Sequence, residues 1–198
     1  MTQDIYLTGI TTTGTPHIGN YVGAIKPAIA ASRNPGVDSY FFLADYHALI
    51  KCQDPQLVRQ STKEIAATWL ALGLDTDNAL FYRQSDIPEI PELTWILSCV
   101  TPVGLLERCH SYKDKVARGL TPNHGLFSYP VLMAADILAY DSDTVPVGED
   151  QVQHIEVCRD LAASFNHQFG ETFVMPKAKL IDTSARVPGV DGEKMSKS

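Results

Sequence analysis

Strand-like and helix-like segments alternate along this chain, and that alternation limits the folds open to it. Residues 40–44 and 79–82 are short apolar runs of strand length, and a helical pattern over residues 55–72 separates them. Asp54 and Pro55 supply the N-cap and the first-turn proline of that helix. Because strands that alternate with helices pair in parallel through crossover connections, the pattern predicts an α/β fold: a Rossmann-like doubly wound parallel sheet with helices on both faces.

A chain of 198 residues, 44% hydrophobic and 20% charged, can bury one full core. We therefore expect a single domain in which Trp69 and Trp95 serve packing. No apolar stretch reaches the ~18 residues that a membrane span needs, and the N-terminus lacks the basic and apolar segments of a signal peptide. These features predict a cytoplasmic protein that does not bind a membrane.

The net charge of −7, from 23 acidic and 16 basic residues, argues against a surface built mainly to hold nucleic acid. The densest basic stretch runs from Arg108 to Arg118 and includes Lys113 and Lys115. It is the best candidate in the chain for contacts with phosphates. The alternative is a solvated helix face on which these cations alternate with acidic neighbours.

The cysteines are spread along the chain without a Cys-x-x-Cys pair. Such spacing predicts neither a zinc site nor a disulfide framework, so we expect reduced thiols and no metal site built from protein side chains. The four residues are Cys52, Cys99, Cys109 and Cys158.

The segment after the first predicted strand has the composition of a phosphate-binding loop. A strand-like run at residues 5–7 precedes Thr-Thr-Thr-Gly-Thr-Pro-His-Ile-Gly-Asn at residues 11–20, and a helical pattern begins at Tyr21. Glycines let backbone N–H groups approach a phosphate, and hydroxyls and an imidazole add donors. An ordinary β-α turn would explain threonine and glycine alone, but His17 with the Gly-Asn pair after it favours a phosphate site.

The sequence closes with Lys-Met-Ser-Lys-Ser at residues 194–198. Two ammonium groups three positions apart on a hydroxyl-bearing segment can grip phosphates, although a string of this kind taken alone is more often a solvated tail. Its interpretation therefore depends on the loop near the N-terminus.

A helical pattern over residues 128–140 carries a carboxylate on an apolar face. Tyr129, Met133 and Asp136 share that face, and Pro130 stands in its first turn. A buried carboxylate is costly without a partner, so Asp136 is either salt-bridged or capping, or it accepts a hydrogen bond from a ligand. An acceptor beside a methionine and an aromatic ring suits a flat apolar ligand with one N–H donor, and indole is such a group.

A second junction of strand and helix lies at residues 145–151, Val-Pro-Val-Gly-Glu-Asp-Gln. Gly148 permits the close approach of a nucleoside, and the acidic residues after it can accept from ribose hydroxyls. Alternatively, Glu149 and Asp150 are only the favourable acids of a first helical turn. His47 follows the end of a predicted strand, where open α/β sheets place ligands, and is as plausibly structural as functional.

The His-x-Gly-Asn loop at residues 17–20 and the terminal Lys-Met-Ser-Lys-Ser resemble the paired signatures of class I aminoacyl-tRNA synthetases. Leu-Glu-Arg at residues 106–108, Met-Ala-Ala-Asp-Ile at 133–137 and Val-Gly-Glu-Asp-Gln at 147–151 extend the resemblance, over nearly the whole chain, to the tryptophanyl-tRNA synthetases. The first signature of the class I family normally ends in His, and the Asn found here is common in the tryptophanyl branch of that family.

This resemblance implies that L-tryptophan is activated by ATP, with Mg²⁺ bound through the ATP phosphates, and is then transferred to tRNA(Trp). No protein nucleophile is needed, because the tryptophan carboxylate attacks the α-phosphorus itself. The resemblance also implies a homodimer. It implies that residues 1–198 are a catalytic domain that ends at the Lys-Met-Ser-Lys-Ser loop, without the helical anticodon-binding domain that follows in the family.

The same resemblance implies the site residues. Catalytic charge and donors are expected from His17, Lys115, Lys194 and Lys197. Contacts with ATP are expected from Thr11, Thr12, Thr13, His17, Gly19, Asn20, Gly148, Glu149, Asp150, Val187, Lys194, Met195, Ser196, Lys197 and Ser198. Contacts with tryptophan are expected from Leu7, Gly9, His47, Tyr129, Met133, Asp136, Val147 and Gln151.

Individual roles are implied for some of these residues. Asp136 accepts from the indole N–H while Met133 packs on the ring, and Tyr129 and Gln151 hold the α-amino group. Asp150 accepts from the ribose. A ligand such as phenylalanine would leave the carboxylate unpaired, which could reject it by up to about 10⁴–10⁵ in a favourable site. Thr11 and Thr12 stand where many bacterial members have Gln and Pro, so their roles are the least defined.

Three other functions remain open. A tyrosyl-tRNA synthetase has the same architecture, but it is expected to carry a Tyr/Asp pair that reads the substrate hydroxyl. A small-molecule nucleotidylyltransferase shares the histidine loop, but it is not expected to carry Asp136 or the Gly-Glu-Asp-Gln run. A non-catalytic tryptophan- or adenylate-binding module would show no tryptophan-dependent pyrophosphate exchange.

Overall fold

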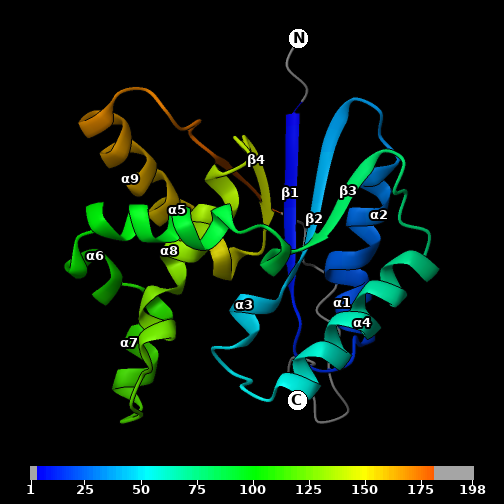
Figure 1. Cartoon of the computed structure of the whole chain (residues 1–198), viewed down its shortest axis with the longest axis horizontal. Coiled ribbons are helices and arrows are strands. Elements are labelled where there is room, and N and C mark those ends of the chain that lie inside the picture. Colours follow the sequence, from blue (N-terminus) through cyan, green and yellow to red (C-terminus); the bar gives the residue numbers. More distant parts are fainter. Residues whose placement is uncertain (1–3, 181–198) are drawn as a thin grey trace. The chain divides into compact units, whose positions relative to one another are not determined.

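The computed structural model describes residues 4–180 of the chain. The chain divides into two compact units (Figure 1). Among the described residues, the first comprises residues 4–86 and Leu180, and the second comprises Ile87–Lys179. Within residues 4–180, no helix is long and apolar enough to cross a membrane.

The first unit is built on three parallel strands in the order β3-β2-β1. They are β1 (Asp4–Thr11), β2 (Val37–Ala44) and β3 (Ala79–Arg83). Gly9 lies opposite Phe42 across the first pair, and Phe42 lies opposite Tyr82 across the second. The parallel pairing predicted from the alternation of strands and helices is thereby confirmed for these strands.

The helix that follows β1 begins earlier than its apolar pattern predicts. It starts with α1 (Ile18–Asn20) and continues through the π-helical turn η1 (Tyr21–Ile25) into α2 (Lys26–Ser32). The predicted start at Tyr21 is wrong because the His17 side chain acts as the N-cap, a role in which Ser, Thr, Asp and Asn are preferred.

The remaining helices of the first unit are α3 (Asp45–Ala48), α4 (Pro55–Ala71) and the 3₁₀ turn η2 (Gln84–Asp86). Helix α4 starts where the sequence predicts, because the Asp54 side chain accepts hydrogen bonds from the N–H groups of Gln56 and Leu57. The cap and the first-turn proline together determine its N-terminus.

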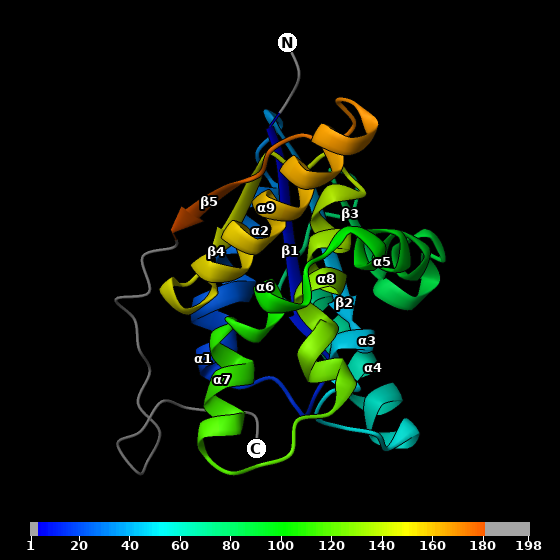
Figure 2. The same cartoon turned by 90° about the vertical axis from the view of Figure 1, so that its left-hand side faces the viewer.

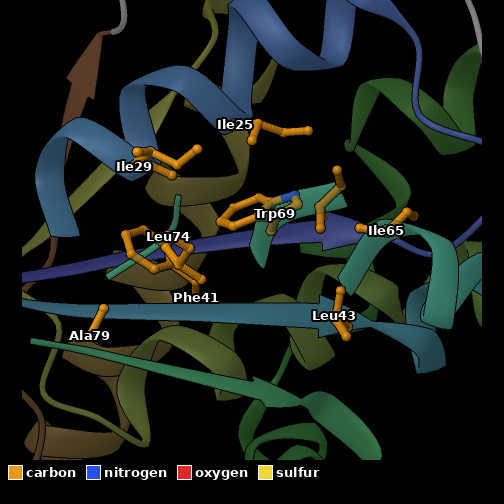
Figure 3. Close-up of a cluster of buried hydrophobic side chains, with 10 residues drawn as sticks. Ile25, Ile29, Phe41, Leu43, Ile65, Trp69, Leu74 and Ala79 are labelled. Atoms are coloured by element: carbon orange, nitrogen blue, oxygen red, sulfur yellow. The ribbon is translucent and has the colours of Figure 1, made fainter. Parts of the chain in front are cut away.

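Helices α2 and α4 pack on the three-stranded sheet over a buried hydrophobic core, drawn in Figure 3. Trp69 of α4 is fully buried, as predicted, and its ring lies 5.5 Å from Phe41 of β2 and 5.5 Å from Phe81 of β3. Ile25 and Ile65 complete the contact from the helices. Burial of a side chain of this size contributes on the order of 2–3 kcal/mol, so this cluster holds the first unit together.

The second unit is mainly helical (Figure 2). Helix α8 packs against both α5 and α9, and the small side chains of Ala134 and Ala135 on α8 are fully buried. Cys158 of α9 is buried too, with its sulfur 4.0 Å from the carbonyl of Ala134. The elements are α5 (Glu89–Val100), α6 (Val103–Glu107), α7 (His110–Ala117), α8 (His124–Leu138), β4 (Thr144–Val147), η3 (Glu149–Gln151), α9 (Val152–Phe169) and β5 (Lys177–Leu180).

Two expectations about this unit are wrong. Pro130 lies inside α8 rather than in its first turn, because Asn123 caps an earlier start by accepting from the N–H of Leu126 at 2.7 Å. Trp95 is 73% exposed on α5, whereas Ile90 and Leu97 of the same helix are fully buried. Helix α5 is apolar around most of its circumference, so its sequence does not show which face is buried.

Candidate functional site

The loop after β1 ends in a reciprocal cap that joins two of the predicted ATP-binding residues. His17 Nδ1 accepts from the backbone N–H of Gly19 at 3.1 Å, and the backbone N–H of His17 donates to Oδ1 of Asn20 at 3.1 Å. Because an accepting Nδ1 carries no hydrogen, the neutral ring carries its hydrogen on Nε2. The imidazole therefore offers an N–H donor at the start of the helix.

The threonines before this cap differ in accessibility. Thr11 is half-buried at the end of β1, and the backbone N–H of Thr13 donates to its carbonyl at 3.0 Å. Thr12 is fully buried, and its hydroxyl has no hydrogen-bond partner among the residues that the structure describes.

A tether that sequence reasoning missed joins the same loop to α4. Thr15 Oγ1 donates to one carboxylate oxygen of Glu64 at 2.9 Å, and Gln60 Nε2 donates to the other at 2.8 Å. The hydrogen bonds from Gln60 and then from Thr15 lower the pKa of the Glu64 carboxyl. Thr15 and Glu64 are far apart in sequence, so no local pattern indicates the pair.

Leu7 and Gly9 lie on the same face of β1, as their spacing requires. Leu7 is buried and Gly9 is exposed. A Cβ atom at Gly9 would overlap the ring of Phe42, which stacks on Tyr82 with ring centroids 5.7 Å apart. The glycine is therefore needed for the packing of Phe42, whatever ligand this face binds.

His47 is half-buried in α3, directly after β2, where the sequence places it. This helix is tied to η2 by hydrogen bonds that the sequence did not reveal. The carboxylate of Asp45 accepts from the backbone N–H of Ser85 at 3.0 Å and from its hydroxyl at 2.5 Å. The backbone N–H of Tyr46 donates to Oε1 of the fully buried Gln84 at 3.1 Å. These contacts hold His47 at the carboxyl ends of β2 and β3.

In the second unit, α8 carries three of the predicted tryptophan contacts. Asp136 is buried with 2% exposure, and Tyr129 and Met133 are half-buried. The burial expected for a carboxylate on this face is confirmed.

The hydroxyl of Tyr129 lies between two side chains from other helices. It is 2.8 Å from Oγ of Ser111 on α7 and 2.9 Å from Nε2 of His154 on α9, and the tyrosine and histidine rings meet edge to face at 5.2 Å. Burial raises the pKa of the Tyr129 hydroxyl. Neither partner was predicted from the sequence, although His154 stands three positions after Gln151, near the start of α9.

The junction after β4 has the predicted form. Val147 is buried at the end of the strand, Gly148 is half-buried at the start of η3, and Glu149 and Gln151 are exposed. The side chain of Asp150 lies outside the described part of the structure.

Lys115 is half-buried on α7, one helical turn after Ser111, and the other basic residues of this stretch are exposed. The described residues include no group of three or more His, Cys, Asp or Glu side chains that could hold a metal ion. The remaining predicted ATP contacts fall outside the described residues, namely Val187, Lys194, Met195, Ser196, Lys197 and Ser198.

The chain matches the family described as tRNA synthetases class I (W and Y) over residues 2–198. It is 62% identical over 201 residues to a tryptophan–tRNA ligase of Bordetella pertussis, a match that covers 97% of this chain and 45% of that protein. The chain thus spans less than half the length of this relative.

Solved structures agree with the sequence match. The crystal structure of tryptophanyl-tRNA synthetase from Campylobacter jejuni matches with a TM-score of 0.91 at 50% identity, over 99% of this chain and 60% of that one. A second structure of the Campylobacter jejuni protein, in complex with ADP and tryptophan, matches with a TM-score of 0.90 at 51% identity, over 98% of this chain and 60% of that one. Together with the parallel strands described above, these matches confirm the predicted α/β, Rossmann-like fold.

Proposed function

This chain belongs to the class I tRNA synthetases for tryptophan and tyrosine, and we propose that it is the catalytic part of a tryptophan–tRNA ligase. It would activate L-tryptophan with ATP and pass the tryptophanyl group to tRNA(Trp). The Campylobacter jejuni relative was crystallised with ADP and tryptophan, which supports these ligand classes. Residues 1–198 would form the catalytic domain. The anticodon-binding domain would belong to the part of the relatives that this chain does not cover.

The burial of Asp136 is the observation that best supports tryptophan as the substrate. The side chain is 2% exposed on α8, on the face shared by Tyr129 and Met133. An ionised carboxylate only accepts hydrogen bonds and has room for several donors, so Asp136 can take the single indole N–H in addition to its partners in the protein. A ligand without that N–H would lack this hydrogen bond and would bind more weakly.

The loop after β1 would supply donors for ATP. When the tryptophan carboxylate attacks the α-phosphorus, the bond from that phosphorus to the pyrophosphate oxygen breaks and negative charge grows on the leaving group. The Nε2–H of His17 and the ammonium of Lys115 would stabilise that charge, with Lys194 and Lys197 contributing from outside the described residues. Mg²⁺ would be bound through the ATP phosphates, so this chain's own part is to position the substrates and to offset charge.

We also propose a homodimer in the cytoplasm that binds tRNA(Trp). The α5 side chains Trp95 and Ile96, which are 73% and 43% exposed, support a partner surface on this helix, because exposed apolar patches mark interfaces. Light scattering on the full-length protein tests the dimer. A mass of one chain at micromolar concentration would exclude it.

Calorimetric titration with tryptophan and with tyrosine tests the substrate. The full-length protein is expected to bind tryptophan and to show no heat with tyrosine at the same concentration. Asp136→Ala is expected to weaken tryptophan binding by roughly 10- to 100-fold, the range for a hydrogen bond to a charged group. Asp160→Ala, which removes an exposed carboxylate from α9, serves as the matched control. Unaltered binding by Asp136→Ala would exclude the indole contact.

A further inference from the structure

We propose that His154, with Ser111, is a positioning residue that holds the Tyr129 hydroxyl ready to accept from the α-ammonium group of tryptophan. This inference rests on the proposed function and adds two residues to the expected amino-acid site.

Two side chains from neighbouring helices contact the Tyr129 hydroxyl. Ser111 Oγ approaches it from α7 at 2.8 Å, and His154 Nε2 approaches it from α9 at 2.9 Å. The edge-to-face contact between the histidine and tyrosine rings also restrains the ring plane of Tyr129, with centroids 5.2 Å apart and an interplanar angle of 76°. Both the oxygen and the ring of Tyr129 are therefore held by groups outside its own helix.

The Tyr129 hydroxyl needs a polar neighbour because it has only one hydrogen. A phenol has one hydrogen to donate, whereas an ammonium group only donates. For Tyr129 to accept from the substrate, its own hydrogen must point at a different acceptor. Both Ser111 Oγ and the unprotonated Nε2 of His154 can take that hydrogen, and the phenolic oxygen can then accept from the substrate in addition to its contacts within the protein.

The second predicted contact to the ammonium group, Gln151, lies directly before the helix that carries His154. Gln151 ends η3 directly before α9 and stands three positions before His154, which is close to one helical turn. A further bond fixes this end of α9, because the backbone N–H of His110 donates to Oε1 of Gln153 at 2.9 Å. Tyr129, held by His154, is thus tied to the same end of α9 as Gln151.

The test compares L-tryptophan with indole-3-propionate, which keeps the indole ring and the carboxylate and lacks the ammonium group. Both are titrated by calorimetry into the full-length protein. We expect His154→Ala to weaken tryptophan binding about 10-fold, because the variant displaces the Tyr129 hydroxyl that accepts from the ammonium group but does not remove it. The affinity for indole-3-propionate, which has no ammonium group, should stay unchanged. His154→Gln, whose amide can donate or accept at a similar reach, is expected to restore tryptophan affinity to within about threefold.

His167→Ala removes an exposed histidine from the other end of α9 and is the matched control. Equal weakening of both ligands by His154→Ala would mean that the residue only supports the fold, and it would overturn the inference. Unchanged tryptophan binding, or no restoration by His154→Gln, would overturn it as well. If the wild-type protein binds no tryptophan, the proposed function itself fails, and that result is distinct from the other outcomes.

Discussion

The side chains of His17 and Asn20 form a reciprocal cap at the start of α1, in which each accepts a hydrogen bond from a backbone N–H group. His17 Nδ1 accepts from the N–H of Gly19, and Asn20 Oδ1 accepts from the N–H of His17, both at 3.1 Å. One ring nitrogen of His17 therefore serves the fold, and the other, Nε2, carries the N–H that we propose as a donor to ATP. The two roles can be separated by mutation.

His17→Asn is expected to keep the N-cap of α1 and to slow adenylate formation. Asparagine is among the best N-cap residues, so the free energy of unfolding should stay within about 0.5 kcal/mol of wild type, whereas His17→Ala should lose about 1 kcal/mol. Both variants lack the Nε2–H donor, and the rate of adenylate formation should fall by about 10²-fold or more in each. Chemical denaturation and pyrophosphate exchange measure the two effects. A normal exchange rate in His17→Asn would contradict the proposed role of the His17 Nε2–H as a donor to ATP.

Gly9→Ala is expected to destabilise the first unit by about 1–3 kcal/mol, because the added methyl overlaps the ring of Phe42. Gly36→Ala is the matched control, since the nearest atom to its Cβ, Asn34 Oδ1, lies at 3.4 Å. The double variant Gly9→Ala with Phe42→Leu should recover part of the loss, because a smaller side chain makes room for the methyl. Denaturant titration reports all of these values, and strictly additive losses would contradict the proposed clash.

Thr15→Ala is expected to raise the pKa of the Glu64 carboxyl toward its ordinary value. The hydrogen bonds from Gln60 and Thr15 favour the ionised form, so the folded-state pKa lies below the unfolded one. The stability from this pair is therefore present above the unfolded pKa and is lost as the pH falls through the folded pKa. Carbon-detected NMR titration of Glu64 measures the shift. An unchanged pKa in the variant would show that the bond to Thr15 is not populated in solution.

Cys158 is expected to resist alkylation in the folded protein. Burial raises the pKa of its thiol to about 12, so almost no thiolate is present at pH 8, and burial also raises the pKa of Cys109. Cys99 is exposed and should react first with iodoacetamide. Peptide mass spectrometry after timed labelling distinguishes them, with a Cys99→Ser variant as control. Labelling of Cys158 as fast as that of Cys99 would contradict its burial.

Local signals in the sequence were enough to predict much of the fold. The apolar runs at residues 40–44 and 79–82 predicted β2 and β3, and Asp54 with Pro55 predicted the start of α4. Each of these features depends on neighbours in the chain, so periodicity and capping rules reach them. Asp136 was found in the same way, because helical spacing places it among apolar side chains.

The features that the sequence did not reveal depend on contacts between distant segments. The tether from Thr15 to Glu64 and the contact of His154 with Tyr129 join residues whose proximity no periodic pattern encodes. Trp95 was expected to serve packing but is exposed, because the sequence of an apolar helix does not indicate which side is buried. The start of α1 was missed because histidine is an uncommon N-cap.

The most direct test of the proposed function is ATP–pyrophosphate exchange by the full-length protein, with each amino acid supplied alone. We predict exchange that requires tryptophan, that is absent with tyrosine or phenylalanine, and that falls in Asp136→Ala. Exchange driven by tyrosine, or tryptophan binding without any exchange, would contradict the proposal that this chain activates tryptophan.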